Sequence, residues 1–251
     1  MITTITILLF VALSGSYDPL SLQSLYLNVV TDGQYVFSGT GFLVEHDSRI
    51  YLVTNQHVFT GIEFFNNTPL APDSSKPVEL HLWFHGPLPG EWIVGVESLY
   101  NEDVSPRWIT HRYENADAAV LPLENIPHGA LIHTLSLSQA ETDLTVMPGI
   151  TLYIIGFPYG RASTGKMPIW KTAHLASEYD LDVEGARAFL VDATTREGMS
   201  GAPVVLRSFE CSSGENVSTR FMGIYSAQYL DAEIGIVWRP EIITEILQSI
   251  R

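Results

Sequence analysis

Short apolar runs separated by turn-forming residues recur along most of the chain, and they restrict its fold more than any other feature. Runs rich in Val, Ile, Tyr, Phe and Thr are typical of β-strands. We expect strands at residues 25–30, 41–44, 50–54, 78–84, 92–96, 118–121, 151–155, 169–173, 188–191, 203–206, 221–226 and 235–238. This spacing favours an antiparallel barrel or sandwich over alternating β–α units.

Only one long helix has a clear signature. Residues 240–250 place five aliphatic side chains at helical spacing, and Pro240 suits a first helical turn. Strand signals lapse at residues 123–143, which we interpret as a connector between two halves of similar size.

Composition excludes several classes of partner. The chain has 251 residues, and its 28 acidic and 13 basic side chains give a net charge of −15. Since an acidic surface repels phosphate, we expect no nucleic-acid partner and no anionic membrane partner. Cys211 is the single cysteine, so an intrachain disulfide and a thiolate zinc site are both excluded. Nothing in the sequence indicates an oligomeric state.

The N-terminus permits two interpretations. Residues 5–13 are apolar and precede the small residues 14–16, as in a cleaved signal peptide spanning residues 1–16. No Lys or Arg precedes this run, and it is too short to span a membrane. An apolar arm or extra strand is the alternative. Secretion or periplasmic export and a cytoplasmic location therefore both stay open.

Three local motifs follow one another in the order His, Asp, Ser. They are Thr-Asn-Gln-His-Val around His57, Asn-Ala-Asp-Ala-Ala-Val-Leu around Asp117, and Gly-Met-Ser-Gly-Ala-Pro around Ser200. A serine hydroxyl is a weak nucleophile that needs an adjacent base, and histidine can take and return its proton near neutral pH. A carboxylate on the far ring nitrogen fixes the histidine tautomer. The residues therefore predict a catalytic triad.

The glycines of the serine motif suit an oxyanion hole. Glycine permits backbone conformations that other residues resist, so the amides of Gly198 and Ser200 can point at a developing oxyanion. An α/β-hydrolase elbow would need Gly at Ala202 and would place its histidine last in the chain. Glu114 is a rival to Asp117 as the acid of the triad.

These motifs resemble those of the trypsin-like (chymotrypsin-fold) serine peptidases. Asp-Ala-Thr-Thr-Arg-Glu-Gly-Met-Ser-Gly at residues 192–201 and Gly-Phe-Pro-Tyr-Gly at 156–160 are similar to loops of the bacterial high-temperature-requirement (Deg-type) branch. The resemblance runs from about residue 20 to the C-terminal helix and leaves no sequence for a PDZ domain. It implies an all-β fold of two antiparallel six-stranded barrels, at residues 17–130 and 131–251, with the C-terminal helix in the second unit.

Two departures from the family pattern bear on activation and specificity. Met199 stands where digestive enzymes carry the aspartate that pairs with a new N-terminal amine, so activity would not depend on that ion pair. The resemblance also implies a substrate pocket formed by Thr194, Ser226 and Gln228. We expect it to take a small or medium uncharged side chain before the scissile bond, with Asp192, Asp231 and Glu233 as alternative acidic residues at the pocket.

The predicted activity is that of a serine endopeptidase acting through an acyl-enzyme on protein or peptide substrates. The alternatives are a catalytically silent peptide-binding or protein-binding module on the same fold, and an esterase that uses the same triad. We expect no cofactor and no metal, because His81 and His85 lie in a strand-like run without a third ligand.

Overall fold

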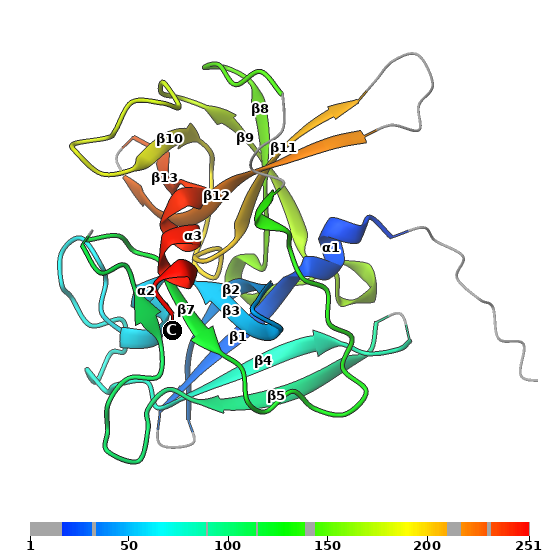
Figure 1. Cartoon of the computed structure of the whole chain (residues 1–251), viewed down its shortest axis with the longest axis vertical. Coiled ribbons are helices and arrows are strands. Elements are labelled where there is room, and N and C mark those ends of the chain that lie inside the picture. The colour runs from blue at the N-terminus through cyan, green and yellow to red at the C-terminus, as the bar shows by residue number, and fades with distance from the viewer. Residues whose placement is uncertain are drawn as a thin grey trace, which may run out of the picture.

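Two antiparallel sheets, one from each half of the chain, form the protein, and Figure 1 shows them as separate bodies with α3 beside their junction. The computed structural model describes residues 17–31, 34–88, 90–113, 115–138, 144–209, 217–229 and 232–250. The apolar run at 5–13, Glu114, Cys211 and Asp231 lie outside the described residues.

The N-terminal sheet has seven strands in the order β5-β4-β1-β2-β3-β7-β6. The strands are β1 (Ser24–Thr31), β2 (Gln34–His46), β3 (Arg49–Thr54), β4 (Glu79–His85), β5 (Trp92–Ser98), β6 (Ile109–Thr110) and β7 (Ala119–Pro122).

This sheet differs from the expected six-stranded barrel, because its edge strands β5 and β6 do not pair directly in the described structure. Arg107 links the two edges instead. Its N–H donates to the Leu99 carbonyl at 3.0 Å, and its guanidinium binds Glu97 at 2.9 Å. The short β6 therefore leaves part of this edge to the backbone and side-chain contacts of Arg107.

The C-terminal sheet is a closed barrel in the order β10-β13-β12-β11-β8-β9, as expected. Its strands are β8 (Thr151–Gly156), β9 (Ile169–Leu175), β10 (Ala188–Asp192), β11 (Pro203–Phe209), β12 (Val217–Tyr229) and β13 (Ile234–Trp238). The pairing of β12 with β13 shifts register between Tyr225 and Gln228. Such an irregularity locally interrupts the ladder, and it lies at Ser226 and Ala227.

Three α-helices and the 3₁₀ turns η2 and η3 accompany the strands. They are α1 (Pro19–Gln23), α2 (Gln56–Thr60), α3 (Pro240–Gln248), η2 (Pro158–Gly160) and η3 (Thr164–Lys166). Helix α3 confirms the C-terminal helix signature, whereas the sequence did not indicate α1 or α2. No helix within the described ranges has the length and apolar character needed to cross a bilayer.

The apolar core is continuous across the junction of the two sheets. One buried cluster joins Phe42 and Val53 of the N-terminal sheet to Ile224 and Trp238 of the barrel and to the apolar face of α3. Each sheet also encloses a core of its own. Because packed cores resist sliding, the junction holds side chains from both sheets in a fixed relation.

Candidate active site

Two neighbouring strands of the N-terminal sheet bring His57 and Asp117 together. Thr54 at the end of β3 pairs with Ala119 at the start of the antiparallel strand β7. The chain leaves that end of β3 into α2, which carries His57, and it enters β7 just after Asp117. Since paired strand ends lie side by side, two residues 60 positions apart meet at one corner of the sheet.

Asp117 holds the histidine through two contacts. His57 Nδ1 lies 2.6 Å from Asp117 Oδ2, and the His57 backbone N–H donates to Asp117 Oδ1 at 3.0 Å. The Ser226 hydroxyl also donates to Asp117 Oδ2, and Asn55 Nδ2 donates to the Asp117 carbonyl oxygen. Asp117 is fully buried, so the His57 and Ser226 donors replace water around its carboxylate. With Nδ1 engaged, Nε2 is the ring nitrogen left for proton transfer.

The surroundings of His57 tune its basicity. Burial by itself lowers the pKa of His57, since it disfavours the imidazolium. The Asp117 carboxylate acts in the opposite direction through its charge and its hydrogen bond, and Glu63 adds to this effect. The net result is a His57 pKa raised above its ordinary value.

Ser200 lies in the loop between β10 and β11, where the barrel meets the N-terminal sheet. Gly201 has a φ of +87°, and a Cβ at this residue would run into the Thr40 carbonyl oxygen and the Thr54 hydroxyl. Only glycine allows this approach. The Thr40 N–H then donates to the Ser200 carbonyl oxygen at 2.8 Å. The docked loop places Ser200 with His57 in the lining of two shared cavities.

The Ser200 hydroxyl donates to the Ser226 carbonyl oxygen at 3.2 Å. In the described structure it makes no hydrogen bond with His57. A nucleophile and its base often align only when substrate is bound. The 3.2 Å contact is long for an O–H···O hydrogen bond, so little free energy is lost when the hydroxyl turns toward another acceptor.

The backbone before Ser200 has the form of an anion-binding turn. Gly198 has a φ of +89°, and a Cβ there would clash with the Phe157 carbonyl oxygen. The Tyr159 N–H donates to the Glu197 carbonyl oxygen at 2.6 Å. Because N–H and C=O point in opposite directions across a trans peptide, this contact turns the Gly198 N–H away from Tyr159. Neither the Gly198 nor the Ser200 N–H donates to another described residue.

Met199 anchors the same turn. Its side chain is fully buried and packs in the core of the C-terminal barrel. Its N–H donates to the Arg196 carbonyl oxygen at 3.2 Å, and its own carbonyl accepts from Ala202 at 3.0 Å. Apolar packing therefore holds the turn at a position where the family pattern has an ion pair.

One cavity beside Ser200, of about 410 Å³, is lined by two of the three residues expected at a substrate pocket. Ser226 and Gln228 line it, whereas Thr194 is exposed outside it and its neighbour Thr195 takes a place in the wall. The Thr195 hydroxyl contacts the Tyr225 hydroxyl and donates to Gln228 Oε1 at 2.9 Å. This hydrogen-bonded group narrows the space available to a side chain.

Two of the three acidic residues considered for that pocket do not line it, and the third, Asp231, lies outside the described residues. Asp192 and Glu233 are exposed and lie outside the cavity wall. Glu63, Arg196 and Glu197 are the charged side chains that do line it besides His57.

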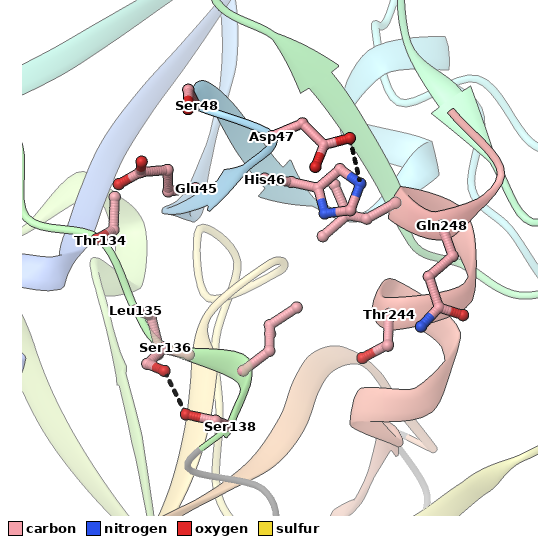
Figure 2. Close-up of a pocket in the computed structure, with 12 residues that line it drawn as sticks. Glu45, His46, Asp47, Ser48, Thr134, Leu135, Ser136, Ser138, Thr244 and Gln248 are labelled. Carbon is pink, nitrogen blue, oxygen red and sulfur yellow. Dashed lines mark hydrogen bonds and ion pairs between the residues drawn. The ribbon is translucent and has the colours of Figure 1, made fainter. Parts of the chain in front are cut away.

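One further polar cavity lies away from the catalytic candidates. A cavity of about 570 Å³ lies between the β2–β3 turn, residues 134–138 and α3. Figure 2 shows its His46 facing its neighbour Asp47, 3.6 Å away. The catalytic candidates do not line this cavity. The described residues contain no group of three His, Cys, Asp or Glu side chains that could hold a metal ion, and His85 is buried in β4.

Sequence reasoning missed several residues of the site. Thr195, Tyr225 and Tyr159 line or shape the cavities, and Asn55 and Thr40 hold the backbone around Asp117 and Ser200. A polar or aromatic residue in a turn or strand has no distinctive pattern. The Gly-Phe-Pro-Tyr-Gly turn was the one signal that included Tyr159.

Comparison with known proteins identifies the family. The profile of the trypsin-like peptidase domain matches residues 39–211. Among curated proteins, none matches the chain in sequence.

Solved structures share the fold. The active form of the Rv3671c protease from M. tuberculosis is 17% identical with a TM-score of 0.51, and the alignment covers 92% of this chain and 82% of that one. A serine endoprotease from Yersinia pestis is 15% identical with a TM-score of 0.56, and the coverage is 93% and 66%. At this identity the likeness extends to the fold alone, which is chymotrypsin-like.

The family match favours an enzyme over a silent binding module, and a protease implies a peptide substrate. The resemblance to the Deg-type branch in particular stays a prediction. With a trypsin-like domain that spans more than half of its length, the chain belongs to the trypsin-like peptidases and is a serine-type peptidase, a hydrolase.

Proposed function

We propose that the protein is an endopeptidase in which Ser200 is the nucleophile, His57 the general base and acid, and Asp117 the residue that orients His57. The observation that carries this proposal is the buried contact of 2.6 Å between His57 Nδ1 and Asp117 Oδ2, at a corner that also holds Ser200. A carboxylate so placed selects the tautomer with its proton on Nδ1, and Nε2 is then free to accept a proton.

Acylation begins when Ser200 Oγ attacks the carbonyl carbon of the scissile bond. The hydroxyl proton passes to His57 Nε2, and the carbonyl oxygen becomes an oxyanion. The C–N bond then breaks, and the imidazolium gives its proton to the departing amine. The acyl group remains on Ser200 Oγ as an ester.

Deacylation repeats these steps with water as the nucleophile. His57 takes a proton from the water as it attacks the ester carbonyl carbon, and the proton then returns to Ser200 Oγ as the carboxylic acid leaves. The raised pKa of His57 favours proton uptake, and the Asp117 charge stabilises the imidazolium in both halves of the reaction.

The oxyanion is assigned to the amides of Gly198 and Ser200. Two features support this role: both N–H groups lack an acceptor among the described residues, and the Tyr159–Glu197 hydrogen bond fixes the orientation of the Gly198 peptide. Donors fixed before the reaction stabilise developing charge without reorganisation, and loss of one such donor typically costs about 10²–10³ in kcat.

The cavity beside Ser226 is proposed to take the residue before the scissile bond. The Thr195, Tyr225 and Gln228 side chains occupy part of that space, which favours a small or medium side chain. The backbone of Ser226 and Ala227 lies at the register shift of β12, where it is available to pair with an extended substrate.

The test is Ser200→Ala, with hydrolysis of a denatured protein substrate and thermal unfolding measured together. We expect hydrolysis to disappear while Tm stays unchanged. Ser136→Ala, in the cavity of Figure 2, is the matched control and should retain full activity. Undiminished hydrolysis by Ser200→Ala would show that another residue is the nucleophile.

A further inference from the structure

A second cavity adjoins Ser200 on the side away from Tyr225 and Gln228. Its volume is about 400 Å³, within the range of roughly 300–1,000 Å³ typical of ligand pockets. It shares five lining residues with the first cavity: His57, Leu70, Tyr159, Glu197 and Ser200. The nucleophile and its base therefore lie at the junction of two spaces. With the cavity beside Gln228 proposed for the residue before the scissile bond, the second space is left for residues after it.

The wall of this second cavity combines aromatic, apolar and anionic groups. Tyr35 and Tyr159 are 58% and 57% exposed, so their rings are accessible to a ligand. Phe37 and Leu70 are half-buried apolar neighbours. Glu197 is exposed and makes no side-chain hydrogen bond or ion pair with the described residues. Among the described residues, no Lys or Arg lines the cavity.

We propose that this cavity binds an arginine side chain within the first two residues after the scissile bond. The inference rests on the proposed function and extends it to a substrate class. An arginine stem packs on apolar walls while its head stays solvated, its planar guanidinium stacks on aromatic rings, and it pairs with a carboxylate through a fork of N–H donors. Leu70 and Phe37, the tyrosine rings and Glu197 supply these three elements.

Glu197 lines both cavities, whereas Glu63 and Arg196 line the first one only. The presence of a cation distinguishes the two cavities. Arg196 lines the cavity beside Gln228, and its guanidinium donates to the Thr195 carbonyl oxygen at 2.7 Å. In the second cavity, no Lys or Arg of the described chain compensates the charge of Glu197. The net charge of −15 also attracts cationic peptides over a longer range. A positive side chain is therefore favoured on the leaving-group side of the bond.

The experiment uses the purified full chain and a peptide library randomised on both sides of a central bond. Sequencing the new amino termini reports the residues that follow the cleaved bond. Matched peptides carrying Arg, norleucine or Glu at the enriched position then give ratios of kcat/KM. We expect Arg to exceed both other residues by about tenfold or more, the scale on which pocket contacts discriminate. Added salt should reduce this ratio, since the cavity is open to solvent.

Two variants test the assignment of the wall. Glu197→Gln should lower the Arg-to-norleucine ratio severalfold, and Tyr35→Ala should lower it independently. Glu178→Gln removes another exposed carboxylate, outside the cavity wall, and should leave the ratio unchanged. A ratio is insensitive to the fraction of folded enzyme, so partial misfolding of a variant does not obscure the result.

Failure of the inference differs from failure of the proposed function. Cleavage with no enrichment of Arg after the bond, or with enrichment that Glu197→Gln leaves intact, overturns the inference alone. The same holds if a fluorophosphonate labels Ser200 but the Arg peptide is not cleaved. Absence of both cleavage and labelling overturns the proposed triad and the inference together.

Discussion

The His57 imidazole and the Asp117 carboxylate contact one another at 2.6 Å in a setting where Asp117 is completely shielded from solvent. The ring is attached to α2 and the acid precedes β7. Their relation is therefore fixed by the β3–β7 pairing rather than by the contact alone. A substitution that keeps the shape of Asp117 but removes its charge therefore separates the effect of the carboxylate charge from the effect of the strand pairing.

Asp117→Asn is expected to lower kcat by about 10⁴-fold, because an amide in this place favours the wrong imidazole tautomer. The amide retains one oxygen to accept from the His57 N–H, so the fold should persist. Ser226→Ala removes one hydrogen bond to Asp117 and should cause a smaller loss. Steady-state kinetics on equal amounts of folded protein provide the measurement, and equal losses for the two variants would argue against Asp117 as the orienting acid.

Met199→Asp is expected to destabilise the protein by roughly 3 kcal/mol or more, since a fully buried carboxylate would lack a partner cation. Met199→Leu nearly conserves volume and should cost less than about 1.5 kcal/mol. Urea unfolding compares the two variants. Equal stability of Met199→Asp and the unaltered protein would mean that the turn before Ser200 does not depend on apolar packing.

The acid limb of the pH–activity profile should lie above the ordinary histidine range. Burial lowers the pKa of His57, but Asp117 and Glu63 outweigh it and the net direction is upward. Since the base must be neutral, kcat/KM falls as pH drops through this raised pKa. Glu63→Gln keeps an acceptor for the Phe65 and Asn66 amides and should move the limb to lower pH. A limb that stays in place would exclude Glu63 from tuning His57.

Stability should decrease as pH falls from about 6.5 to 4. Burial lowers the pKa of His85 to about 4, and the nearby His133 adds to the shift. The unfolded chain binds this proton first, so the lost stability amounts to roughly 3 kcal/mol for the single group. Unfolding free energies across this range measure the effect. Replacement of His85 by Phe should flatten the profile, while His128→Gln at an exposed site should not.

The strand pattern predicted most of the fold because burial of alternate side chains leaves its signature in the sequence. Twelve of the described strands, β1 to β5 and β7 to β13, overlap expected runs. The two-residue strand β6 and the five-residue helices α1 and α2 were not predicted. Elements this short are defined by tertiary contacts, such as the bond from Trp170 Nε1 to Ser21 Oγ that holds α1 against the barrel.

The candidate site was only partly accessible from the sequence. The order of the motifs predicted that His57, Asp117 and Ser200 act together. In the structure, His57 contacts Asp117 and lines one cavity with Ser200. The residues that line the substrate pocket were harder to predict, because neighbouring residues in an irregular loop alternate between solvent and interior. Thr194 is exposed whereas Thr195 is buried, and no pattern in the sequence distinguishes them. The contact from Tyr159 to Glu197 depends on the meeting of two distant loops.

The most direct test of the triad is reaction of the purified protein with a fluorophosphonate probe, followed by mass-spectrometric location of the adduct. We expect labelling at Ser200 that disappears in His57→Ala while the variant remains folded. A well-folded protein that is not labelled, or one labelled equally well without His57, would contradict an assembled Ser200–His57–Asp117 triad.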